Sequence, residues 1–384
     1  MKIKSIELLR LHMPRQEPPT SPRRPSWAVG AEVANPMSKF PEFKRHRDLW
    51  MPRWESLWVR VTAEDGTCGL SPCSYGPAVA PIIGHFATHL VGQDALATER
   101  CWDLMFRLSK PYGTVGLAAV AMSGVDVALW DLKGRLLGRP VYELLGGKVR
   151  ERIFAYATGN DTDWQLELGF RAVKLACPYG PADGLWGLEQ NEELIARTRA
   201  LAGEHVEIML DCYMAFDVEY TVRLAERLRP YRLKWIEEYL IPEDLDGHVA
   251  VRERLPWQTL ATGEHMYTPW PFRYLIEHRA VDIVQPDLFW AGGITACRHI
   301  AEMANAAGLT VILHGGGGSP YGLHLTCAMP NMPWAEYGVW SAPGVPLAEV
   351  PSLPGTTTPQ EGWLSVNEGP GFGVEIPEAW LEPF

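Results

Sequence analysis

The fold class is decided by residues 281–315, which have the sequence VDIVQPDLFWAGGITACRHIAEMANAAGLTVILHG. The runs VDIVQPD (281–287) and LTVILHG (309–315) are short, apolar and rich in β-branched residues, as buried strands are. Between them, residues 296–307 have the spacing of an amphipathic helix. Such a strand–helix–strand unit is typical of a parallel α/β fold.

Further strand-like runs lie in the same part of the chain, at residues 152–159, 171–176, 206–211, 233–238, 259–264 and 334–340. Helical stretches such as 191–202 and 218–229 separate them. Eight strands that alternate with helices favour a TIM-like barrel over an open, doubly wound sheet. No GxGxxG or GxxxxGK[ST] motif follows the first strand, so a nucleotide-binding fold has no support.

The region before the barrel is of mixed α+β type. Its features are an opening strand, a second strand at 55–63, a turn at 64–66 and then helical segments. Residues 14–52 are rich in proline and have no sustained period of 2 or 3.6, which indicates a long loop. The aromatic residues Trp27, Phe40, Phe43 and Trp50 favour a functional lid over a disordered segment.

Composition excludes several classes of function. The 384 residues include 35 Lys and Arg against 46 Asp and Glu, a net charge of −11, so the mean field repels nucleic acid and anionic membranes. Charges interrupt each apolar stretch before it is long enough to cross a bilayer, and the first residues do not resemble a secretion signal. Seven scattered cysteines without a CxxC pair indicate a reducing compartment. We therefore expect a cytoplasmic protein that binds neither nucleic acid nor membrane.

Polar residues end successive strands at one-repeat intervals: Asp211, Glu237, Glu264, Asp287, His314 and Glu336. In a barrel such positions converge at the C-terminal mouth, where catalytic residues lie. Carboxylates on adjacent strands repel one another unless a cation binds between them. An all-oxygen site suits Mg²⁺, with Mn²⁺ as an alternative ion, better than Zn²⁺.

His314 is a candidate general base. Asp287 ends the neighbouring strand and can accept a hydrogen bond from one imidazole nitrogen, which fixes the tautomer and raises the basicity of the other nitrogen. The alternative is a loop histidine bonded to backbone. The following glycine run, 315–318, either holds a phosphate or leaves room for a polyol, and the sequence leaves this open.

The run VDVALWDLKGRLLGRPVYELLGG (125–147), together with these strand-end residues, resembles the mandelate racemase branch of the enolase superfamily. The resemblance covers almost the whole chain. It implies a (β/α)7β barrel under an α+β capping domain and abstraction of the proton α to a carboxylate. It also implies one Mg²⁺ per subunit, held by Asp211, Glu237 and Glu264.

The implied domain organisation has three parts. Residues 1–118 form the capping domain with the lid loop 14–52, residues 119–342 form the barrel, and residues 343–384 return to the cap. The expected partner is a small-molecule acid sugar, and the subunit is expected to form a homo-oligomer.

One departure from the branch bears on the reaction. Many members carry Lys-x-Lys on the second barrel strand, and the second lysine is a base opposite the histidine. Here the segment is Lys174-Leu175-Ala176, so the resemblance implies only that Lys174 binds the substrate carboxylate. Racemisation needs proton transfer on both faces, whereas dehydration can use one residue on one face, so we expect a dehydratase.

Five segments are similar to those of L-rhamnonate dehydratases: 35–40, 210–212, 234–238, 263–265 and 334–336. The similarity implies that Glu336 acts as an electrophilic partner for a substrate oxygen. Residues 27–33 lack the lid histidine of those enzymes. The predicted reaction is Mg²⁺-dependent dehydration of an aldonate, L-rhamnonate-like, to a 2-keto-3-deoxy acid by a carbon–oxygen lyase. The alternatives are an epimerase or racemase on the same fold and a metal-binding barrel without turnover.

Overall fold

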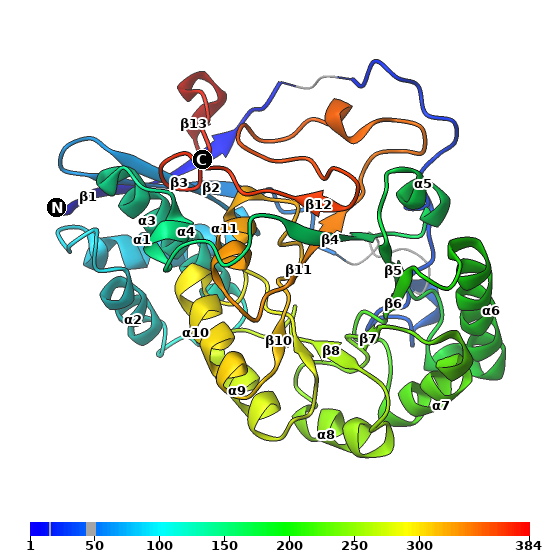
Figure 1. The fold of residues 1–384 in the computed structure, drawn as a ribbon. Coiled ribbons are helices and arrows are strands. Elements are labelled where there is room, and N and C mark those ends of the chain that lie inside the picture. The colour runs from blue at the N-terminus through cyan, green and yellow to red at the C-terminus, as the bar shows by residue number, and fades with distance from the viewer. Residues whose placement is uncertain (15–16, 44–50) are drawn as a thin grey trace.

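The structure is a computed structural model that describes residues 1–14, 17–43 and 51–384 (Figure 1). The remainder of the predicted lid, including Trp50, lies outside the described residues.

Residues 153–338 form a parallel barrel. Its strands are β4 (Ile153–Thr158), β5 (Ala172–Ala176), β6 (Glu207–Asp211), β7 (Trp235–Glu237), β8 (Leu260–Thr262), β9 (Ile283–Val284), β10 (Thr310–Val311) and β11 (Trp334–Gly338). Neighbours pair in parallel from β4 to β10, and β11 returns to pair with β4. The predicted TIM-like architecture is confirmed.

One helix follows each of the first seven barrel strands, as the (β/α)7β arrangement requires. They are α5 (Thr162–Glu167), α6 (Gly184–Ala202), α7 (Val218–Leu228), α8 (Leu245–Arg254), α9 (Pro269–Glu277), α10 (Gly293–Ala306) and α11 (Pro320–Ala328). Apolar residues from the outward faces of β5 to β10 pack against the helices in one large cluster, and those of β4 and β11 pack in a smaller one. Figure 1 shows α6 to α10 as an outer ring around the strands.

The capping domain is an antiparallel sheet with helices against it. The sheet contains β1 (Ile3–Leu11), β2 (Leu57–Ala63) and β3 (Cys68–Cys73), and the helices are α1 (Gly76–Leu90), α2 (Thr98–Leu108) and α3 (Leu117–Leu137). Helix α3 approaches β3 so closely that a Cβ on Gly69 would lie 2.2 Å from the Ala128 carbonyl oxygen. Only glycine fits there, which is why the sheet and helix pack tightly.

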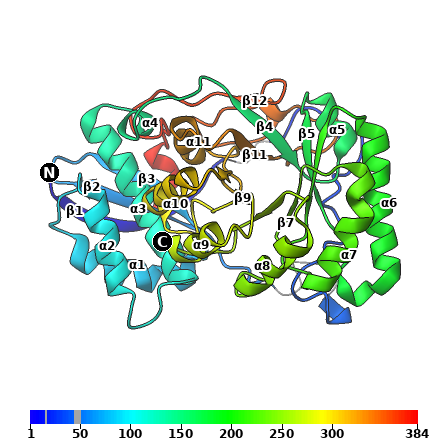
Figure 2. The same cartoon turned by 60° about the horizontal axis from the view of Figure 1, so that its bottom comes forward.

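The C-terminal segment returns to the cap. This segment begins after the last barrel strand and contains η5 (Leu347–Glu349), β12 (Trp363–Leu364), η6 (Glu378–Trp380) and β13 (Leu381–Pro383). The short helix α4 (Val141–Leu144) lies earlier in the chain, between α3 and the first barrel strand. Strand β12 pairs with β4, and β13 pairs antiparallel with β1. The cap lies beside the barrel in Figure 2, at the end of the molecule that holds β1 and β2.

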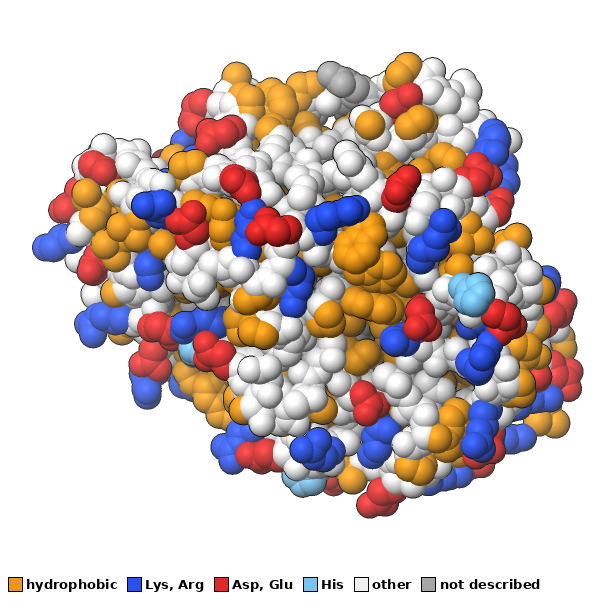
Figure 3. Space-filling model, in the orientation of Figure 1, with side chains coloured by type: hydrophobic (Ala, Val, Ile, Leu, Met, Phe, Trp, Pro, Cys, Tyr) orange, Lys and Arg blue, Asp and Glu red, His pale blue; other side chains and the backbone are white. Residues whose placement is uncertain are grey.

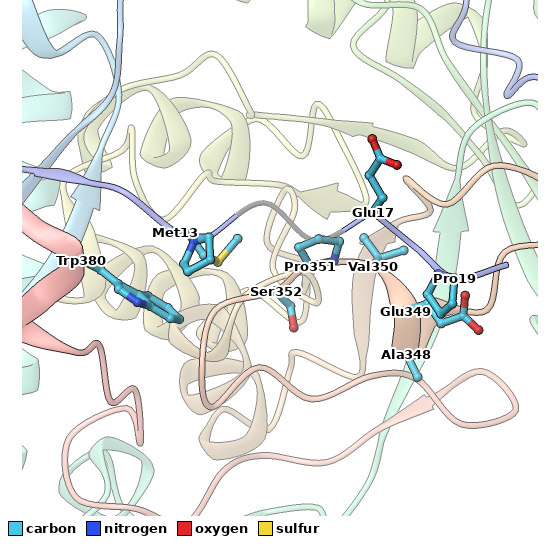
Figure 4. A pocket seen from close by; sticks show the side chains of 10 residues that line it. Met13, Glu17, Pro19, Ala348, Glu349, Val350, Pro351, Ser352 and Trp380 are labelled. Carbon is cyan, nitrogen blue, oxygen red and sulfur yellow. The ribbon is translucent and has the colours of Figure 1, made fainter. Parts of the chain in front are cut away.

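The predicted domain boundary at residue 118 stays a prediction. It falls at the start of α3, and this helix contributes to two cores: Val125 and Leu129 pack in the cap, whereas Val127 and Trp130 pack in the barrel. A cavity of about 440 Å³ lies between Trp380, residues 348–352 and the residues Met13, Pro14, Glu17 and Pro19 (Figure 4). Its lining contains none of the predicted site residues.

The described surface carries charged side chains of both signs (Figure 3). Acidic and basic side chains are interspersed over the face in Figure 3. Within the described residues, no helix combines the length and apolar content needed to span a membrane. All seven cysteines are free. The cytoplasmic location stays a prediction.

Candidate active site

The period of two along each barrel strand determines which side chains reach the mouth. Met209, Trp235, Tyr156 and Trp334 fill the barrel interior. Because alternate residues face the same side, the next inward positions towards the C-terminal end are Asp211, Glu237, Thr158 and Glu336. Lys174 follows the inward Ala172 on β5 in the same way. The site is thus the polar top layer of an otherwise apolar barrel interior.

The three predicted metal ligands come together. One carboxylate oxygen from each of Asp211, Glu237 and Glu264 lies within 4.8 Å of the others. Glu237 is oriented by hydrogen bonds to Oε2 from Trp235 Nε1 at 2.7 Å and Gln285 Nε2 at 2.9 Å. Among the described residues, the buried Glu264 Oε2 has no hydrogen-bond partner. A buried carboxylate oxygen without a donor fits a cation as its missing partner.

The pKa values of two of these carboxylates also favour a bound cation. Burial raises the pKa of Glu264 to about 8, and burial also raises the pKa of Glu237. Burial is the largest cause of both shifts, so the site disfavours the charged form of these carboxylates. A divalent cation compensates such a donor set, and the all-oxygen composition suits Mg²⁺.

Lys174 lies at the centre of the acidic groups, with 1% of its side chain exposed. Its ammonium is paired with Glu237, lies 2.8 Å from Glu336 Oε1 and lies 3.5 Å from Asp211 Oδ2. Burial alone would lower the pKa of Lys174, but the carboxylates of Glu237 and Glu336 raise it well above its ordinary value. Lys174 is therefore a fixed cation beside the candidate metal site.

His314 and Asp287 form the predicted pair. The His314 Nδ1 atom lies 2.6 Å from Asp287 Oδ2, and Asp287 also accepts a hydrogen bond from the Phe289 amide at 2.6 Å. The other ring nitrogen, Nε2, lies 3.3 Å from Glu264 Oε1. Burial opposes the charged imidazolium, but Glu264 and the Asp287 bond outweigh it and raise the pKa of His314 well above its usual value. Nε2 is thus directed at the carboxylate cluster.

Glu336 is held as a hydrogen-bond acceptor. Thr158 Oγ1 lies 2.5 Å from its Oε1, and the Gly315 amide donates to its Oε2 at 2.9 Å. Burial opposes ionisation, but Lys174 and His314 lower the pKa of Glu336 to about 2. The predicted electrophilic role requires a protonated carboxyl and stays a prediction.

The glycine run after His314 has a structural explanation. The Gly315 amide donates a hydrogen bond to the side chain of Glu336. The Gly317 amide donates to the backbone carbonyl of Glu336 at 2.7 Å. A Cβ on Gly317 would lie 2.7 Å from the Glu336 carbonyl oxygen. These glycines pack the loop onto β11, and two of the amides that a phosphate would need are already bonded.

A second histidine–carboxylate pair was not predicted. His265 Nδ1 lies 2.9 Å from Glu238 Oε1, and these two residues with Glu264 make another group close enough to hold a metal ion. The rings of His265 and His314 both pack against Trp290, at centroid distances of 5.3 and 5.4 Å. In the sequence, this second pair is indicated only by the adjacent dipeptides Glu237-Glu238 and Glu264-His265.

The described part of the lid packs against the mouth end of the barrel. The Ala34 amide donates to the Cys177 carbonyl beyond β5 at 2.8 Å, and Ala34, Asn35 and Ser38 are buried. Asn35 Oδ1 accepts a hydrogen bond from the Met37 amide, which shapes the Asn-Pro-Met-Ser turn. Residues 34–38 are therefore docked on the same rim as the carboxylates.

Comparison with known families gives two matches that together cover most of the chain. Residues 54–146 match the mandelate racemase / muconate lactonizing enzyme N-terminal domain. Residues 162–380 match the enolase C-terminal domain-like family.

Individual relatives extend this result. L-rhamnonate dehydratase of Saccharopolyspora erythraea is 40% identical over 359 residues, which cover 92% of each chain. The Mg-complexed rhamnonate dehydratase of Gibberella zeae superposes with a TM-score of 0.90 and 33% identity, over 100% of this chain and 96% of that one. The 3,6-anhydro-D-galactonate cycloisomerase of Zobellia galactanivorans gives 0.75 and 26%, over 100% of both chains. The chain therefore belongs to the mandelate racemase / muconate lactonizing enzyme family of the enolase superfamily.

Proposed function

We propose that this protein is a Mg²⁺-dependent hydro-lyase that dehydrates a sugar acid. Relatives named L-rhamnonate dehydratase over nearly the full chain support the reaction class. The observation that carries the proposal is the position of His314, whose Nε2 lies 3.3 Å from Glu264 Oε1 at the edge of the carboxylate cluster. A substrate carboxylate bound at the cluster would bring its α carbon next to this imidazole.

Asp211, Glu237 and Glu264 would hold one Mg²⁺ per subunit, with Mn²⁺ as an alternative. When bound, the ion supplies Lewis-acid stabilisation of the negative charge that develops on the substrate carboxylate. Lys174, which is already fixed among the carboxylates, supplies a second positive charge to the same substrate group.

His314 carries the proton. Its Nε2 takes the proton from C2, and Asp287 stabilises the resulting imidazolium through Nδ1. The imidazolium then protonates the 3-hydroxyl, the C3–O bond breaks and water leaves. The remaining enol loses its hydroxyl proton and takes a proton at C3, which gives the 2-keto-3-deoxy acid. One residue thus serves both the C2 deprotonation and the protonation of the leaving hydroxyl.

Among the residues that the structure describes, the position of the second lysine holds no base. At the position of the second lysine, Ala176 is held by Asn160, whose side chain bonds both the amide and the carbonyl of Ala176 at 2.8 and 3.0 Å. His265 does not fill this role, because it lies beside the same Glu264 oxygen and the same Trp290 ring as His314. The two histidines flank one side of the site, which favours dehydration over epimerisation.

Glu336 accepts hydrogen bonds, so we propose that it orients a hydroxyl of the sugar acid. L-Rhamnonate is the first substrate to test because of the named relatives. The absence of a histidine from residues 27–33 makes a different aldonate the second choice.

The test is a screen of aldonic and aldaric acids with MgCl₂, in which 2-keto acids are trapped as semicarbazones. We expect 2-keto-3-deoxy product from an aldonate, and none from a His314→Asn variant. A product with the mass of the substrate would overturn the proposal, because it indicates an epimerase or a cycloisomerase. Failure of every acid in the wild-type enzyme would favour a binding protein.

A further inference from the structure

Asp161 is a buried carboxylate that the proposed chemistry does not use. It occupies the N-cap position of α5, where an aspartate ordinarily accepts a hydrogen bond from its own helix. Here the side chain makes no such bond, although only 4% of the residue is exposed. A buried charge needs other partners, because an uncompensated carboxylate is strongly disfavoured.

Those partners all come from the lid. Asp161 Oδ2 accepts hydrogen bonds from Ser26 Oγ at 3.0 Å and from the Trp27 amide at 2.9 Å. Its Oδ1 pairs with Arg24 Nη1 at 2.5 Å. Charge-assisted bonds to a buried acceptor are stronger than neutral ones, so this carboxylate is the main polar anchor of residues 24–27.

The anchored segment lies at the active-site rim. Asp161 is three residues beyond Thr158, whose hydroxyl contacts Glu336. Between them, Gly159 has φ +133°, and a Cβ there would lie 2.5 Å from Trp27 Nε1. The indole is therefore packed onto the backbone where β4 ends, beside the residue that positions Glu336.

Nearby surface pairs provide a contrast. Arg24 also contacts Asp163 at 2.6 Å, and Arg23 contacts Glu167 at 2.6 Å, but both of these carboxylates are half exposed. Exposed ion pairs contribute little to stability because solvent screens them. The anchoring function is thus concentrated in Asp161 rather than shared along α5.

We propose that Asp161 is a positioning residue that docks the lid and seats Trp27 over the mouth of the barrel. The effect on substrate binding rests on the proposed function, whereas the docking itself does not. When the anchor is lost, only a fraction of molecules has a closed lid before binding, and the apparent affinity falls by that fraction. Bound substrate still closes the lid, so turnover at saturation changes less.

The test compares Asp161→Ala with the matched control Glu167→Gln, which breaks only the exposed pair of Arg23 with α5. Hydrogen–deuterium exchange of a peptide spanning residues 24–29 reports docking without turnover. We expect faster exchange and a KM raised about tenfold or more in Asp161→Ala, with kcat changed less than about threefold. Asp161→Asn, which keeps an acceptor oxygen, should be intermediate, and Glu167→Gln should match the wild type.

Arg24→Gln removes the arginine that the lid contributes to the ion pair with Asp161. Because Arg24 is half exposed, this variant tests the same contact without changing a buried residue, in case Asp161→Ala does not fold. It should also speed exchange over 24–29. Unchanged exchange in both variants overturns the proposal, as does an equal effect of Glu167→Gln or a loss of kcat at constant KM. If the wild type dehydrates no sugar acid, the proposed function fails, and the exchange data alone decide whether Asp161 docks the lid.

Discussion

Asp287 and His314 are joined twice: their backbones form a parallel bridge beyond β9 and β10, and Asp287 Oδ2 lies 2.6 Å from His314 Nδ1. The backbone bridge fixes the separation of the two Cα atoms, so the side-chain bond does not depend on a mobile loop. The imidazole is therefore preorganised, with Nε2 directed at Glu264. This arrangement is the basis for the first prediction.

Replacing His314 by Asn should abolish both dehydration and exchange of the C2 proton with D₂O. Loss of a general acid–base residue reduces the rate by roughly 100-fold to 10,000-fold. Asp287→Asn should reduce both activities by a smaller factor, because the imidazole remains but its tautomer is no longer fixed. NMR of the substrate in D₂O measures both. Continued exchange without dehydration in His314→Asn would show that another residue is the base.

Metal binding should stabilise the protein through the three carboxylates. At a free Mg²⁺ concentration of 100 times the dissociation constant, the bound ion adds about 2.7 kcal/mol to the free energy of unfolding. We expect MgCl₂ to raise the melting temperature of the wild type, and not that of Asp211→Asn or Glu264→Gln. Glu207→Gln is the control, because Glu207 lies at the opposite end of β6 and pairs with Lys234. If MgCl₂ raised the melting temperature of every variant as much as that of the wild type, the assignment of the three carboxylates as ligands would be wrong.

Exchanging lid residues 27–40 for those of a relative should change which sugar acid is accepted. These residues lie on the rim and include the buried Ala34 and Asn35, but they contribute no carboxylate to the cluster. Relative kcat/KM values across an acid panel measure the change, and calorimetry with Mg²⁺ should give the wild-type affinity. An unaltered substrate profile would show that the loop does not determine specificity.

The sequence predicted the barrel from its alternation of strands and helices, and the candidate site from polar residues that end successive strands at one-repeat intervals. The family resemblance selected Glu237 over Glu238, and in the structure Glu237 takes the inward position that alternation along β7 gives it. Glu238 was missed because it leaves this alternation: its φ of 47° turns it from the expected outward direction towards His265. Asp161 was missed because its sequence position indicates an ordinary helix cap, and only the folded lid supplies its partners.

Acid stability should depend on His324, a fully buried histidine on α11. Burial lowers its pKa to about 3, and Nδ1 accepts a hydrogen bond from the Tyr142 amide at 3.2 Å. The unfolded chain takes up a proton below about pH 6.5, whereas the folded state does not until about pH 3. This residue should therefore cost about 2 to 3 kcal/mol of stability between pH 7.5 and 4.5.

A His324→Gln variant isolates this contribution, because glutamine keeps a neutral acceptor for Tyr142. Urea unfolding at several pH values should show a smaller loss of stability on acidification than in the wild type. The matched change at the exposed His205 should leave the pH dependence unaltered. Parallel curves for the wild type and His324→Gln would exclude the buried imidazole as the source.

The pairing of β13 with β1 sets an order of events during synthesis. Leu11 pairs with Leu381, so the ribosome must translate the whole barrel before the cap sheet is complete. Until then β1 has one open edge, with unpaired amides and carbonyls that can template pairing with another nascent chain. Barrel folding can proceed earlier, since β4 to β11 are contiguous in the chain. The cap is therefore the last part to mature, and aggregation during expression should depend on how quickly the C-terminal strand reaches it.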